Sequence, residues 1–190
     1  MSNAAFTRRE LALQQATPHR GRSLRILISF VVLAMAGAAA YAHEAVRSTE
    51  GMVSARVLEG VFGYDLYSWR DQIIFRLGDE RFDVLALRVT VECTSLVVLV
   101  PLLLFGAGIL IFTRVGIGRW VVSVLVAMTI IFTANIVRIA TIGYSLREFG
   151  RDGYGWTHTV VGTGIIAVGT VIAVITMLAI QSHKRNRRRG

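Results

Sequence analysis

The chain has 190 residues, of which 54% are hydrophobic, and its mean hydropathy is +0.57. So apolar a composition is unusual for a soluble domain and favours an integral membrane protein. The net charge is +9 and there is a single cysteine, which excludes an intramolecular disulfide. The lone Cys and the scattered His give no metal-ligand spacing, so we expect no metal and no cofactor.

Four apolar stretches approach the roughly 20 residues that a transmembrane helix needs. None contains Asp, Glu or Lys, and only the first holds an Arg, at its edge. A charge near the bilayer centre costs at least about 2.5–3.5 kcal/mol, so its absence is a strong signal. We predict an all-α membrane protein with about four transmembrane helices, in a domain covering residues 24–182. The predicted spans are 24–42, 96–112, 120–136 and 159–180.

The first stretch has a second interpretation. It follows basic residues and ends in small residues near 38–42, as a cleaved signal peptide does. We favour an uncleaved span, and the orientation of the remaining chain is the same in either case. The polar residues 1–23 are expected to form a loose, disordered cytoplasmic tail with one short helix at 8–16.

Basic residues are concentrated in segments that fall on one side of the predicted spans. The terminal segments and the loop 113–119 hold twelve Lys or Arg against one acid, whereas 43–95 and 137–158 hold nine Arg against eleven acids. Because Lys and Arg favour the cytoplasmic side, we predict a multi-pass plasma-membrane protein with both termini inside and both of those loops outside. The basic tail 183–190 is expected to be an anchor aided by membrane lipids, with no nucleic acid bound.

The segment 43–92 is the one sizeable hydrophilic insert and is expected to be extracytoplasmic. Apolar residues at helical spacing predict a helix over 54–62, lying on the outer leaflet. Ile73, Phe75 and Leu77 alternate as in a strand, 78–80 is a turn signal, and 81–91 continues with β-branched and apolar residues. These features predict a small β-hairpin over 72–91, which we expect to cover a site at its end.

Three chemically useful side chains fall at one predicted depth. Cys93 precedes the second span, Arg138 lies at the outer end of the third, and His158 opens the fourth. A thiolate is the reactive form of cysteine and is favoured by a nearby cation, while histidine exchanges protons near neutral pH. Together they fit acyl transfer through a thioester. Taken singly they fit an inert buried thiol, a headgroup contact and a polar helix end, so the prediction depends on all three.

Three other polar residues are candidates for the same site. His43 lies at the outer end of the first span and is an alternative to His158 as acid and base. Glu92 adjoins the cysteine and fits a base or an orienting group. Asn135 precedes Arg138 by three residues and so shares its helix face, where it fits a role in holding the guanidinium or a substrate carbonyl.

Small residues form a stripe along the fourth predicted span. Gly162 lies one helical turn inward from the histidine, and Gly169 and Ala173 continue the stripe. Small residues let transmembrane backbones approach closely. Simple packing between helices explains the stripe, and the same surface would also accept a helix of a bound substrate.

Three short blocks resemble the signature blocks of exosortases and archaeosortases. They are ECTSL at 92–96, NIVRI at 135–139 and HTVVG at 158–162, in the family's order and helix positions. The resemblance covers about residues 72–180. Family members usually have Gly where Ser95 stands, and many have more spans before the Cys, so this chain is a short, minimal version.

The resemblance implies a membrane cysteine protease or transpeptidase. Its substrate would be an exported protein with a C-terminal motif, a transmembrane helix and a basic tail, cleaved at the outer face of the membrane. The same resemblance implies that Cys93 is the nucleophile, His158 the general acid and base, and Arg138 the stabilising cation.

Two other classes of function remain as alternatives. One is a non-catalytic membrane factor that assembles or binds partners. The other is a small transporter, against which no ionisable residue lies in the middle of a predicted span.

Overall fold

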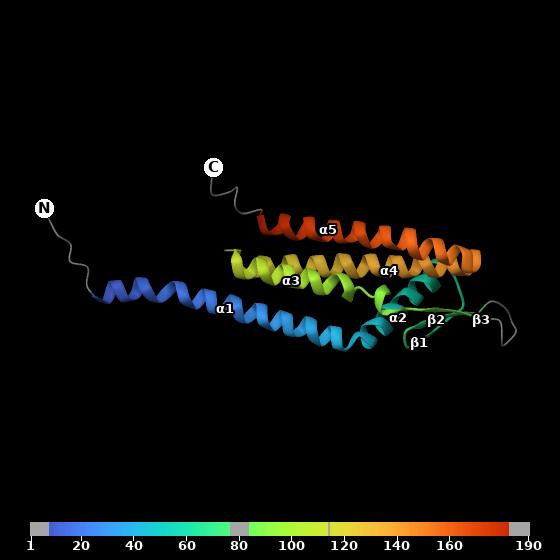
Figure 1. Ribbon diagram of the computed structural model, residues 1–190, viewed down its shortest axis with the longest axis horizontal. Coiled ribbons are helices and arrows are strands. Elements are labelled where there is room, and N and C mark those ends of the chain that lie inside the picture. The colour runs from blue at the N-terminus through green and yellow to red at the C-terminus, as the bar shows by residue number, and fades with distance from the viewer. Residues whose placement is uncertain (1–7, 77–83, 114, 183–190) are drawn as a thin grey trace.

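The computed structural model describes residues 8–76, 84–113 and 115–182, with side chains from Arg22 onward, and it is mostly helical (Figure 1). The long helices run along a common axis, and a small sheet lies at one end of the bundle. The elements are α1 (Arg8–Tyr41), α2 (His43–Phe62), β1 (Leu66–Trp69), β2 (Gln72–Arg76), β3 (Val84–Arg88), η1 (Val91–Cys93), α3 (Leu96–Phe112), α4 (Ile117–Trp156), η2 (Thr157–Val161) and α5 (Gly162–Ser182).

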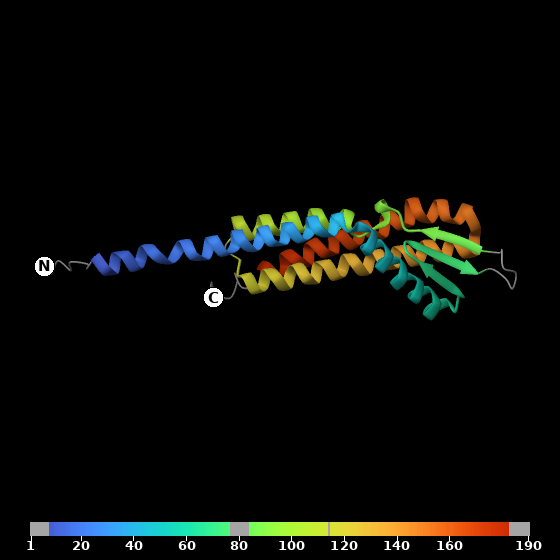
Figure 2. The same cartoon turned by 90° about the horizontal axis from the view of Figure 1, so that it is seen from below.

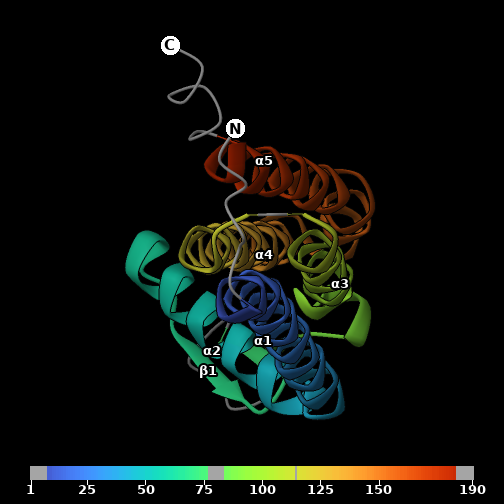
Figure 3. The same ribbon diagram turned by 90° about the vertical axis from the view of Figure 1, so that its left-hand side faces the viewer.

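The helices pack in two pairs, with α1 along α3 and α4 along α5 (Figures 2 and 3). The described start of α1 and the described end of α5 lie at one end of the bundle, and the sheet lies at the other (Figure 1). Helix α1 begins at Arg8, so it includes the short helix predicted at 8–16, and residues 17–23 are helical where a loose tail was predicted. Residues 1–7 of that tail lie outside the described residues.

Two helical stretches are long and apolar enough to be candidate membrane spans, 22–41 and 117–182. The second includes the break between α4 and α5, and α3 is apolar but only 17 residues long. A helical membrane protein is therefore supported, while the number of four transmembrane helices stays a prediction.

The expectation of a loop at 137–158 is wrong, because α4 continues as a helix far beyond position 136. The break comes at Gly150, with φ 65° and ψ −152°. This backbone region is open essentially only to glycine, so Gly150 is the residue at which the chain can leave the helix and turn back toward α5. Arg138 consequently lies within a helix and not at its end, and its backbone is held by regular helical hydrogen bonds.

The stripe of small residues on α5 packs against α4. A Cβ added at Gly169 would lie 2.6 Å from the Cβ of Ala134, and Ala173 is fully buried. The stripe therefore serves packing within the chain, as one of the two interpretations predicted, while a contact with a substrate helix stays a prediction.

The predicted hairpin is confirmed as the antiparallel pair β2–β3, with Ile73 opposite Leu87. The turn signal at 78–80 lies outside the described residues. Strand β1, which we did not predict, pairs with β2 on its other side, so the sheet has the order β1-β2-β3.

The predicted helix at 54–62 is also present, as the second half of α2. Its Leu58 is fully buried against the sheet and α4 and not turned toward a membrane surface. Close packing depends on Gly143 of α4, because a Cβ there would lie 2.9 Å from Leu58 and 3.2 Å from Phe75. The sheet is thereby fixed to α4 at a position shortly after Arg138 in the chain.

Candidate active site

The cysteine lies on a short turn between the sheet and the bundle. Residues 91–93 form a single 3-10 turn in which the N–H of Cys93 donates to the carbonyl of Thr90 (3.0 Å), and α3 begins three residues later. The Cys93 side chain is 6% exposed. A strand on one side and a helix on the other leave the turn little freedom, which suits a residue that must be held in position.

Two buried polar residues hold this turn from neighbouring helices. The Nδ2 of Asn135 on α4 donates to the backbone carbonyl of Cys93 at 2.9 Å. The N–H of Ser95 donates to the Oε1 of Glu50 on α2 at 3.0 Å, and both residues are fully buried. The Glu50 oxygen thereby satisfies one of the N–H groups that a helix start leaves without a partner. The backbone on both sides of the thiol is thus fixed by hydrogen bonds.

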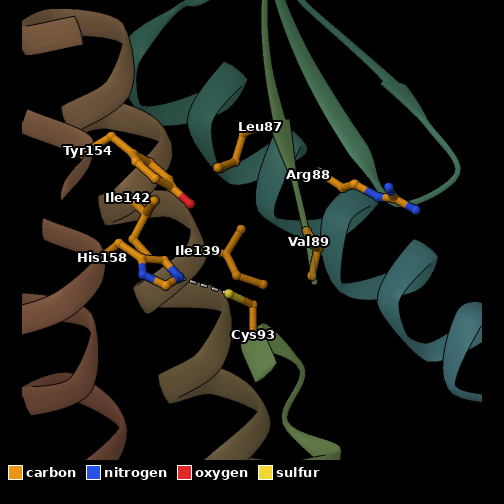
Figure 4. Close-up of a pocket in the computed structure, with 8 residues that line it drawn as sticks. All are labelled: Leu87, Arg88, Val89, Cys93, Ile139, Ile142, Tyr154 and His158. Atoms are coloured by element: carbon orange, nitrogen blue, oxygen red, sulfur yellow. Dashed lines mark hydrogen bonds between the residues drawn. The ribbon is translucent and has the colours of Figure 1, made fainter. Parts of the chain in front are cut away.

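His158 faces the thiol from the far side of the site (Figure 4). It lies in the π-helical turn η2 before α5, and its Nε2 is 3.2 Å from the Sγ of Cys93. Its ring stacks on Tyr154, with centroids 5.3 Å apart and 26° between the planes. π-helical turns are often found at functional sites, and here the turn brings an imidazole within hydrogen-bond reach of the sulfur.

Arg138 approaches the same sulfur from α4. Its Nη2 is 4.0 Å from the Sγ of Cys93, and its Nη1 donates to the carbonyl of Glu92 at 3.4 Å. Its buried Nε has no hydrogen-bond partner among the described residues. A guanidinium that is 7% exposed and directs its Nη2 toward the sulfur is suited to stabilise negative charge on sulfur or oxygen.

The other predicted residues have mixed outcomes. Glu92 is exposed, and a hydrogen bond from the Thr90 side chain is the main cause that holds the pKa of its carboxyl below the ordinary value. Such a carboxylate is a poor base at neutral pH, and its backbone carbonyl, not its side chain, contacts Arg138. His43 is the first residue of α2, where its Nδ1 hydrogen-bonds the Tyr41 carbonyl (3.3 Å). The thiol's imidazole partner is therefore His158.

Gly162 has a clear steric role. A Cβ added there would lie 3.2 Å from the Nε of Arg138 and 3.2 Å from the carbonyl oxygen of Thr157. The absent side chain allows the start of α5, with the histidine one turn before it, to approach the guanidinium.

Three residues near the thiol were not identified from the sequence. The Thr90 hydroxyl lies 3.5 Å from the Sγ of Cys93, and Tyr154 supports the imidazole. Tyr154 precedes His158 by four residues. If a helix had been predicted over both residues, this spacing would have placed them on one helix face. No sequence signal points to Glu50, because a charged residue in an insert usually faces solvent.

A small pocket beside the sulfur is bounded by β3, α4 and the turn η2 (Figure 4). Its cavity volume is about 10 Å³, about the space of a single water molecule. The end of β3 forms one wall, as expected for a hairpin that covers the site. The lining residues are Leu87, Arg88, Val89, Cys93, Ile139, Ile142, Tyr154 and His158.

Fold and site together define a helical membrane protein with a cysteine, a histidine and an arginine gathered at the sheet end of its bundle. The chain matches the family model described as "Transmembrane exosortase (Exosortase_EpsH)" over residues 22–175. It belongs to the transmembrane exosortase family, as the three sequence blocks predicted. No curated protein and no solved structure matches the chain.

Proposed function

We propose that this protein is a membrane cysteine transpeptidase or protease that cleaves C-terminal sorting signals of exported proteins through a thioester on Cys93. The observation that carries the proposal is the distance of 3.2 Å between the Sγ of Cys93 and the Nε2 of His158, with the Arg138 guanidinium 4.0 Å from the same sulfur. Family membership supports the reaction class.

The geometry suggests how each residue acts. His158 takes the thiol proton, and Arg138 stabilises the thiolate that remains. The sulfur attacks the scissile carbonyl, and the oxyanion of the tetrahedral intermediate is stabilised by the guanidinium N–H groups. His158 returns its proton to the leaving amine, which frees the C-terminal fragment and leaves a thioester. Water or an acceptor amine then attacks the thioester and restores the thiol.

We propose a membrane topology in which the catalytic site lies on the outer side of the membrane. Four spans, formed by α1, α3, α4 and α5, would put the basic terminal segments in the cytoplasm and the sheet outside. The substrate would then be an exported protein anchored by its own C-terminal helix, with a basic tail inside and its motif just outside the membrane. In this arrangement the scissile bond reaches the depth of the cysteine before the chain enters the bilayer.

Processing of a reporter tests the proposal. An exported reporter protein is fused to the C-terminal segment of a candidate substrate and expressed with the wild-type enzyme or a variant. Cys93→Ala and His158→Gln are expected to abolish its cleavage, whereas Thr113→Ala, at the opposite end of α3, keeps it. Unchanged cleavage by Cys93→Ala would contradict the proposal and favour a non-catalytic assembly role.

A further inference from the structure

Strand β3 is an edge strand whose outward backbone groups can be assigned from the register. The N–H of Val89 donates to the carbonyl of Asp71, which faces it across the ladder (2.7 Å). Because hydrogen-bonded and non-hydrogen-bonded positions alternate along an antiparallel pair, Leu87 also faces β2. The backbone N–H and C=O groups of Ala86 and Arg88 therefore point away from the sheet, and no described residue hydrogen-bonds to them.

A groove of about 680 Å³ lies along this free edge. Its far wall is the end of α4, around Leu146, Gly150 and Tyr154. The groove and the small pocket at the cysteine share Leu87, Arg88 and Tyr154, so the two adjoin. Figure 4 shows Leu87 and Val89 on the strand that leads down to Cys93, with the Arg88 side chain directed away from the sulfur.

An exposed strand edge is a template for another extended chain. A peptide that adds a strand gains main-chain hydrogen bonds, and pockets for alternate side chains supply selectivity. The groove adjoins the small pocket that contains the thiol, and a protease must present its scissile bond in an extended, accessible form at that atom. A substrate peptide is thus the occupant that fits both the free backbone groups and the position of the groove.

We propose that the extended segment of the substrate just before its scissile bond binds as a fourth strand on the free edge of β3, pairing with the backbone of Ala86 and Arg88. This inference rests on the proposed function. Since β3 runs toward Cys93 and the substrate must enter the membrane after the scissile bond, the added strand runs parallel to β3. Recognition then depends on backbone shape and on every second side chain of the motif.

Two proline variants test the inference with the same reporter. Ala86→Pro removes an outward N–H of β3 and leaves the pairing with β2 intact, since proline is tolerated when the lost N–H faces away from the sheet. Ser68→Pro is the matched control, because the register places its N–H on the outer side of β1, the opposite edge. We expect Ala86→Pro to lower cleavage about tenfold through the loss of one main-chain hydrogen bond and Ser68→Pro to leave it within about twofold. Equal cleavage by both variants would overturn the inference.

Disulfide trapping provides a second test that does not depend on cleavage. In a Cys93→Ala background, Ala86→Cys is combined with single cysteines scanned along the reporter before its cleavage point. Efficient cross-links at every second reporter position are expected, with none to Ser68→Cys. Cross-links without this alternation, or preferentially to β1, would overturn strand addition. Processing that persists in Cys93→Ala alone would remove the proposed function itself and the inference with it.

Discussion

Replacing Arg138 with Gln should slow the alkylation of Cys93. The guanidinium lies 4.0 Å from the sulfur, a separation at which two unit charges attract by about 4 kcal/mol at an effective dielectric constant of 20 and about 1 kcal/mol in bulk water. Because the Cys93 side chain is buried but borders a small pocket, the interaction energy lost should fall between these limits. We therefore expect the alkylation rate at neutral pH to fall roughly 5- to 1000-fold.

The assay is the rate of iodoacetamide modification of the detergent-solubilised protein. Cys93 is the only cysteine in the chain, so all modification reports on this one site. The exposed Arg56 on α2 provides a matched control, Arg56→Gln, which removes the same charge at the surface. An Arg138→Gln protein that stays folded and reacts as fast as Arg56→Gln at neutral pH would refute the electrostatic role of the guanidinium.

Gly162→Ala should lower reporter cleavage severalfold, because the new Cβ would lie 3.2 Å from the Nε of Arg138. Gly164→Ala is the control and should not lower cleavage, because the space around Gly164 is open. Equal cleavage by the two variants would contradict the steric role of Gly162. Burial opposes ionisation of Asp71, but the hydrogen bond from Arg88, a backbone hydrogen bond and the charges of Arg88 and Arg47 outweigh it and hold the pKa of Asp71 below its ordinary value. This carboxylate stabilises the fold above its unfolded pKa, and that stability is lost as the pH falls through the lowered folded pKa. Asp71→Asn should therefore flatten the acid limb of a thermal unfolding series, and an unchanged acid limb would show that the ion pairs do not matter.

Much of the site was predictable because each block is a local pattern. A Cys before one apolar stretch, Asn-x-x-Arg at the end of the next and His before the last follow from the sequence and from the depth that the spans impose. The hairpin was likewise predictable from alternation of Ile73 and Phe75 and the approach to Cys93. These features depend on neighbours in the chain, and the family match confirms the resemblance built on them.

The parts that were missed depend on contacts between distant segments. The buried Glu50 gains its place only because Ser95, 45 residues later, presents a backbone N–H to it. The continuation of α4 past Arg138 was obscured by polar residues that made 137–158 resemble a loop, although the apolar residues between them pack with the sheet and α2 in one core cluster. The break at Gly150 depends on one unusual backbone conformation. Periodicity does not report on such long-range pairings.

The most direct measurement of the proposed chemistry is mass spectrometry of Cys93 after incubation with the reporter. If the protein is a cysteine transpeptidase, the peptide containing this residue carries the reporter's new C-terminus as a thioester that hydroxylamine removes. The adduct should be absent from Cys93→Ala. A reporter that is cleaved by the purified protein while Cys93 never carries the acyl group would contradict the nucleophilic role.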